Sequence, residues 1–232
     1  MNGIGTNFKF QYIKFTIDFL QCTSERFNET DSKMYCTKMF FFLLQLLNVN
    51  HNQCGELKSA ALTPAEIQDI VNIHNSYRKL IGSGQEERGN PGPQPAATNL
   101  EDLVMTWDTE LANFAQSWAN QCDTAHDECR NSGMIHANYF FNIIFSDQDY
   151  TAKFTEIVTM WYDEVDSFNA NQVNSVTDFN GVAHYSQMMW AATKLVGCGG
   201  VRFHNGEWYT TFLVCNYGPM GNWMGEEMYK TR

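Results

Sequence analysis

The stretch that decides the fold lies near the C-terminus and begins with GVAHYSQMMW (Gly181–Trp190). Two runs of strand-forming residues follow at 195–203 and 208–214, and HNGE at 204–207 joins them. The central Asn-Gly of this linker is a strong β-hairpin signal, because both turn positions need a positive φ. The last part of the stretch reads FLVCNYGPMGNW (Phe212–Trp223). We therefore predict a helix that carries His184, then a hairpin, then a glycine-rich closing loop.

The cysteines indicate the compartment. Cys198 and Cys215 lie on opposite arms of the predicted hairpin, at a register that makes a disulfide between them geometrically plausible. Seven cysteines at such spacings suit an oxidising, secretory compartment, the alternative being buried thiols in a cytosolic protein. Because the number is odd, at least one thiol is left over or paired between chains.

Size and charge restrict the class of protein. A chain of 232 residues that is 44% hydrophobic can build one well-cored domain. The formal net charge of −11 and the isoelectric point near 4.9 argue against a nucleic-acid partner, which would need a basic face.

The N-terminal segment, residues 1–50, fits poorly with the domain expected over residues 51–232. Its apolar run MFFFLLQLL (Met39–Leu47) is too short to span a bilayer but has the length of a signal-peptide core. One hypothesis is that the natural start is Met34, or that this segment comes from an imperfect gene prediction. The alternative is an apolar segment that packs on the domain.

Helices and strands can be placed along the rest of the chain. Thr63-Pro64-Ala65-Glu66 is a capping box with proline at the first helical position, and apolar residues then recur at helical spacing to about Leu80. His74 lies on that buried stripe, where a core histidine bonded to backbone is the favoured interpretation. The other predicted elements are a proline-rich loop at 82–99, a helix capped by Asp108, a strand at 134–145 and a helix from Phe154 to Val165. This order indicates an α+β fold, a three-layer α-β-α sandwich with a small antiparallel central sheet.

Four stretches resemble the CAP superfamily (cysteine-rich secretory proteins, antigen 5 and pathogenesis-related proteins). They are HYSQMMW (His184–Trp190), CNYGP (Cys215–Pro219), RGNPGPQP (Arg88–Pro95), and WANQC with HDECR (Trp118–Cys122 and His126–Arg130). The last two are similar to the antigen 5 group of insect venom and salivary allergens. The resemblance extends from about Cys54 to the C-terminus and implies the same sandwich fold.

The resemblance also implies disulfides and a cleft. Cys54 would pair with Cys122, and Cys129 with an upstream cysteine, here Cys22 or Cys36. In the family, two histidines and two acidic or amide side chains converge in a central cleft. The matching positions in this chain are His126, Glu164, His184 and Phe141.

Two chemical interpretations of this cleft remain open. Two neutral imidazoles, His126 and His184, can bind a divalent metal, with Zn or Cu favoured by nitrogen donors, and Glu164 can act as ligand or outer-shell carboxylate. Phe141 departs from the acidic or amide residue of most relatives, which removes one donor. The alternative is a pair of histidines that line the cleft and are held by hydrogen bonds to Glu164 and a tyrosine, without metal.

Catalysis finds little support in the sequence. Ser186 lies two residues from His184, so the two side chains do not face each other on a helix, and there is no Gly-x-Ser-x-Gly elbow. We therefore expect a secreted, non-enzymatic binding protein of the venom or salivary antigen 5 type, whose partner is a small ligand or a host protein. A lipid or sterol carrier is the first alternative, and a divalent-metal site at the two cleft histidines, His126 and His184, is the second. The apolar side chains that could line its channel are Phe140, Phe141, Phe145, Met160, Met188 and Met189.

Overall fold

The computed structural model describes residues 54–100, 104–122, 138–146 and 152–232. The signal-like run and the proposed boundary after residue 50 lie outside these ranges. The elements in chain order are β1 (Glu56–Ser59), α3 (Pro64–Ser83), β2 (Thr106–Trp107), α4 (Thr109–Ala119), β3 (Asn138–Ser146), α5 (Phe154–Asp163), η1 (Glu164–Ser167), η2 (Ala170–Gln172), α6 (Ala183–Met189), β4 (Leu195–His204) and β5 (Tyr209–Gly218).

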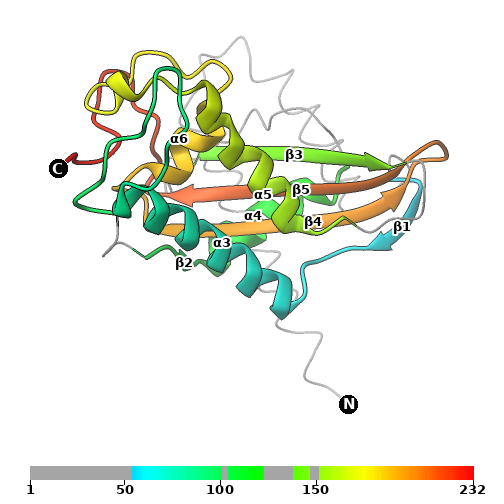
Figure 1. The fold of residues 1–232 in the computed structure, drawn as a ribbon. Coiled ribbons are helices and arrows are strands. Elements are labelled where there is room, and N and C mark those ends of the chain that lie inside the picture. The colour runs from blue at the N-terminus through cyan, green and yellow to red at the C-terminus, as the bar shows by residue number, and fades with distance from the viewer. Residues whose placement is uncertain (1–53, 101–103, 123–137, 147–151) are drawn as a thin grey trace, which may run out of the picture. The chain divides into compact units, whose positions relative to one another are not determined.

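The predicted hairpin forms the centre of the sheet. Strands β1, β4, β5 and β3 follow one another in antiparallel order, and the two-residue β2 pairs with β4 in parallel (Figure 1). Cys198 stands directly opposite Cys215 in the β4–β5 register, and the structure joins them in a disulfide with a Cα–Cα distance of 4.1 Å. This is the pair that the hairpin register predicts. The short strands β1 and β2 were not predicted, because four and two residues are too few to show a period.

Helices cover both faces of the sheet, so the predicted three-layer α-β-α sandwich is confirmed (Figure 1). On one face, α4 packs against Val201, Phe212 and Val214. The approach is close because β4 carries glycine there; a Cβ at Gly199 would collide with the backbone of Gln116 in α4. On the other face, α3, α5 and α6 pack against a separate core that includes Leu213.

The expected helix starts are confirmed. Thr63 accepts a hydrogen bond from the backbone of Glu66, the Glu66 carboxylate returns to the Thr63 backbone, and α3 then runs to a left-handed Gly84 with φ 71°. Asp108 accepts from the Leu111 backbone N–H at 2.8 Å and caps α4.

His74 in α3 is a core histidine, as its place on the buried stripe predicts. Its Nδ1 lies 2.7 Å from the Ile70 carbonyl oxygen and its Nε2 lies 2.8 Å from the Tyr217 hydroxyl. Burial lowers the pKa of His74 to about 4, so the ring stays neutral and links α3 to β5.

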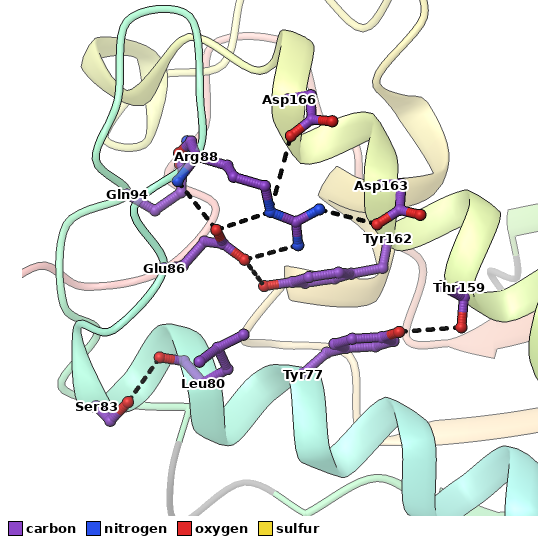
Figure 2. Close-up of polar contacts among 10 residues, drawn as sticks. All are labelled: Tyr77, Leu80, Ser83, Glu86, Arg88, Gln94, Thr159, Tyr162, Asp163 and Asp166. Carbon is purple, nitrogen blue, oxygen red and sulfur yellow. Dashed lines mark hydrogen bonds and ion pairs between the residues drawn. The ribbon is translucent and has the colours of Figure 1, made fainter.

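The proline-rich loop after α3 is anchored by Arg88 (Figure 2). The guanidinium donates to both carboxylate oxygens of the buried Glu86, at 2.9 Å each, and pairs with Asp163 at 2.9 Å and Asp166 at 3.7 Å. The Tyr162 hydroxyl donates to Glu86 at 2.6 Å. The loop is therefore tied to the end of α5 and the start of η1.

This anchor predicts a pH dependence of stability. Burial alone would raise the pKa of Glu86, but hydrogen bonds from Arg88 and Tyr162 outweigh it and lower the pKa from 4.5 to about 2. Because the folded-state pKa is the lower one, the stabilisation is present above the unfolded-state pKa and is lost as the pH falls from about 4.5 towards about 2. We expect Glu86→Gln to be less stable than the wild type at pH 7 and to show a shallower loss of stability over this window.

Urea midpoints measured between pH 7 and pH 2 would check this expectation. Glu87→Gln, at the exposed neighbouring position in the same loop, is the matched control and should follow the wild-type curve. Parallel curves for Glu86→Gln and the wild type would contradict the assignment.

Candidate functional site

The candidate site is built where the end of α5 meets the start of α6. Glu164 follows the last residue of α5, and its Oε2 accepts hydrogen bonds from the backbone N–H groups of His184 at 2.9 Å and Tyr185 at 3.1 Å. The first N–H groups of a helix have no partner within the helix, so this carboxylate satisfies two of them and stabilises the positive end of α6.

The other carboxylate oxygen of Glu164 orients the imidazole of His184. Oε1 lies 2.6 Å from Nδ1 of His184, and the side chains are 20% and 26% exposed, respectively. A histidine whose Nδ1 donates to a carboxylate carries its acceptor lone pair on Nε2 when the ring is neutral. Any ligand bound by a neutral His184 would therefore contact Nε2.

Trp161 fixes the plane of the same imidazole. Its ring stacks on His184 with centroids 5.5 Å apart and planes at 4°, and it is itself buried in the main core. Trp161 precedes Glu164 by three residues, so one turn of chain supplies both the surface under the imidazole and the carboxylate at its edge. This contact was not predicted from the sequence.

The closing loop is bonded to the other side of α6. The buried hydroxyl of Ser186 donates to Oδ1 of Asn222 at 2.8 Å, and Nδ2 of Asn222 donates to the Ala183 carbonyl at 2.9 Å. Gln187 accepts from the Gly221 backbone N–H at 2.8 Å. These bonds engage Ser186 in holding the loop.

A second contact missed from the sequence secures the other end of α6. Arg78 in α3 is 1% exposed, and its guanidinium donates to the carbonyl oxygens of Met188 at 3.1 Å, Trp190 at 3.2 Å and Ala191 at 3.5 Å. The sequence pattern that could have indicated its burial is the position of Arg78 four residues after His74, on the same face of the helix. Burial lowers the pKa of Arg78 to about 10, so the group remains charged at neutral pH.

The remaining predicted site residues fall largely outside the described structure. His126 and Cys129 lie in the segment 123–137, and Cys22 and Cys36 lie before residue 54, none of which is described. For Phe141 the structure gives the backbone pairing with Val214 and no side-chain placement. Within the described ranges, no three His, Cys, Asp or Glu side chains gather in a way that could hold a metal ion.

The side chains considered for a lipid channel lie in different environments. Met188 and Met189 are fully buried in the main core, whereas Phe145 and Met160 are 56% and 45% exposed. Phe140, like Phe141, has no described side chain. The lipid hypothesis therefore stays a prediction.

Comparison with known proteins identifies the family. The profile of the cysteine-rich secretory protein (CAP) family matches residues 71–217. Venom allergen 5 of Vespula pensylvanica is 44% identical over 181 residues, which cover 77% of this chain and 88% of that protein. The chain belongs to the CAP family.

Other CAP proteins agree in sequence and in fold. Venom allergen 5 of Brachyponera chinensis is 41% identical over 76% of this chain and 90% of its own length. The structure of BmVAL-1 is similar with a TM-score of 0.65 and 31% identity, covering 74% of this chain and 84% of that one. NaASP2, whose crystal structure was determined with Zn2+, is similar with a TM-score of 0.61 and 27% identity, over 77% and 91% of the two chains.

The second disulfide is the one that the family resemblance implies. Cys54 is joined to Cys122 with a Cα–Cα distance of 5.3 Å, which ties the start of β1 to the chain just after α4. In the part of the chain that the structure describes, no helix has the length and apolarity needed to cross a membrane.

Proposed function

We propose that this chain is a secreted, non-enzymatic CAP protein of the venom allergen 5 type that binds a ligand at His184, and that a divalent ion such as Zn or Cu is the favoured ligand. The observation that carries the proposal is the pair formed by Glu164 and His184 at 2.6 Å. A carboxylate that accepts from Nδ1 of a histidine is the usual outer-shell partner of a metal-binding imidazole.

The contacts of Glu164 and Ser186 favour binding over catalysis. Both oxygens of Glu164 are engaged by α6, and Ser186 is buried and bonded to Asn222. A hydrolase would need a nucleophile within hydrogen-bond reach of a base, and neither side chain is arranged in that way.

Secretion is supported by the two disulfides and by the family. Disulfides persist in oxidising compartments, and the two bridges among the described residues lie in the part of the chain that matches the venom allergen relatives. Protein sequencing of the chain exported by insect cells would give the mature N-terminus; retention inside the cells would contradict secretion.

For metal binding, His126 is the proposed second ligand, on the strength of the family resemblance. With Phe141 at the fourth cleft position, the chain would offer two imidazoles and one outer carboxylate, and solvent would complete the coordination. Among the relatives described above, NaASP2 is the one whose crystal structure was determined with Zn2+.

Isothermal titration with Zn and Cu tests the proposal. We expect dissociation constants in the micromolar range or tighter for the wild type. The His126→Ala/His184→Ala variant should give no heat of binding above the heat of dilution. His204→Ala is the matched control, because His204 lies at the end of β4 against Tyr209 and should leave binding unchanged. Equal binding by all three proteins would contradict the site, and the absence of heat would direct the search to lipids and host proteins.

The variant Glu164→Gln tests whether Glu164 orients the His184 imidazole for metal binding or only stabilises the fold. The amide oxygen can still accept from the backbone of α6, but the amide N–H groups would donate to Nδ1 of His184 and leave the proton on Nε2. We expect Zn affinity to fall about 10–100-fold while the melting temperature changes little. Wild-type affinity in this variant would show that Glu164 does not orient a ligand-binding imidazole.

A further inference from the structure

The proline-rich loop contains a side chain, Gln94, whose buried amide oxygen has no hydrogen-bond partner among the described residues. Gln94 is 2% exposed; its backbone N–H donates to the Glu86 carbonyl at 3.0 Å and its Nε2 donates to the Arg88 carbonyl at 3.1 Å. Its Oε1 is buried and accepts no bond from the described part of the protein. The amide is therefore fixed at its nitrogen end, with a buried acceptor at the other.

A second buried polar group of this kind comes from α6. Tyr185 is 0% exposed, and its hydroxyl also lacks a partner within the described ranges. A buried hydroxyl without a hydrogen bond costs free energy, and most such groups in proteins are bonded to protein or to ordered water. Two of them on neighbouring elements therefore require an explanation.

Both groups belong to the same region. The Tyr185 ring contacts Phe168 with centroids 5.2 Å apart and Tyr162 at 5.7 Å, and the Phe168 carbonyl accepts from the Asn90 backbone of the loop at 2.9 Å. The Tyr229 hydroxyl donates to the Pro95 carbonyl, next to Gln94, at 3.1 Å.

Electrostatics supports the same placement. The pKa of Tyr185 is raised well above its ordinary value, first by burial and then by the nearby Tyr229, Tyr162 and Glu86. The Tyr185 hydroxyl thus lies within electrostatic reach of Glu86, which belongs to the loop, and of Tyr162 and Tyr229, which bond to it. Tyr162, Phe168 and Tyr229 therefore connect the surroundings of Tyr185 to the loop that carries Gln94.

We propose that an ordered internal water binds between the Tyr185 hydroxyl and Oε1 of Gln94 and connects the proline-rich loop to α6. Water suits this pair because Oε1 can only accept, whereas the hydroxyl can donate or accept, and one water can satisfy both. A single small polar molecule is sufficient for this role, and the Tyr185 ring packs against the rings of Tyr162 and Phe168. The water connects the loop to the residue that follows His184.

Thermal unfolding of four full-length proteins tests this site: wild type, Tyr185→Phe, Gln94→Met and the double variant. Losing a water-bonded hydroxyl should lower the melting temperature by about 2–4 °C. The double variant should unfold close to Gln94→Met, because the second change removes a bond already lost. Tyr217→Phe is the control for a hydroxyl bonded directly to protein, through His74, and should also lower the melting temperature.

The opposite results would overturn the proposal. An unchanged or raised melting temperature for Tyr185→Phe would mean that the hydroxyl is unpaired in the native protein. Fully additive losses would mean that the two groups share no partner. A high-resolution crystal structure of the wild type gives an independent reading: density for a water about 2.6–3.2 Å from both atoms supports the site, and its absence refutes it.

Discussion

Replacing Cys54 and Cys122 with alanine is expected to lower the free energy of unfolding by about 4 kcal/mol. The bridge joins residues 68 apart in sequence, and the entropy that a cross-link removes from the unfolded chain grows with the length of the loop it closes. Its loss would also release β1 from the end of α4, because Cys54 lies two residues before β1 and Cys122 lies three residues after α4. Urea unfolding under non-reducing conditions, followed by tryptophan fluorescence, measures the effect.

The hairpin disulfide provides a matched control within the same protein. Cys198 and Cys215 are only 17 residues apart, so Cys198→Ala/Cys215→Ala should cost less, about 3 kcal/mol. Both cysteine pairs are buried, so the free energy lost through poorer side-chain packing should be similar for the two double variants. A larger cost for the hairpin pair than for the long loop would contradict the loop-entropy explanation and would point to strain or packing instead.

Arg78→Met is expected to lower the free energy of unfolding by about 3 kcal/mol, through the loss of hydrogen bonds to buried carbonyls. The three acceptors, at Met188, Trp190 and Ala191, lie at and beyond the C-terminal end of α6. That end carries partial negative charge, which the guanidinium compensates, so its removal takes one hydrogen bond from each of the three carbonyls and leaves the dipole uncompensated. Because α6 carries His184, the metal affinity proposed for this site should fall together with stability.

Two further variants isolate the contribution of the fork-shaped guanidinium. Arg78→Lys keeps the charge but cannot reach three carbonyls at once, and should cost about half as much as Arg78→Met. Lys79→Met, at the exposed next position of α3, should change stability by less than about 0.5 kcal/mol. A neutral or stabilising Arg78→Met would mean that the cost of burying the charge exceeds the value of its hydrogen bonds.

The local elements could be predicted because their signals are short-range. The Thr63 capping box, the Asp108 cap and the Asn205-Gly206 turn each act within four residues, and all three elements appear where they were expected. The hairpin places Cys198 opposite Cys215 as expected, but only Gly206 of the Asn-Gly pair has the positive φ that was expected at both positions. The two-residue β2 lay below the length at which a pattern can be recognised.

The candidate site was predictable in its residues but not in its geometry. The family resemblance selected Glu164 and His184, while the division of the Glu164 carboxylate between the imidazole and the backbone of α6 emerged only from the structure. The resemblance also selected His126, which the described residues do not include. The stacking of Trp161 on His184 joins segments 23 residues apart, and no local pattern encodes such a contact.

The sequence by itself determined the helices, the hairpin, the hairpin disulfide and, through its motifs, the family. Each depends on spacing along the chain, where backbone geometry fixes which residues meet. Only the tertiary structure decided how buried polar groups are satisfied by distant segments: Arg78 by the carbonyls at the end of α6, and Glu86 by the hydroxyl of Tyr162. Such partners come from distant segments, and they are selected by the cost of leaving a charge or a hydrogen-bonding group unpaired inside the packed core.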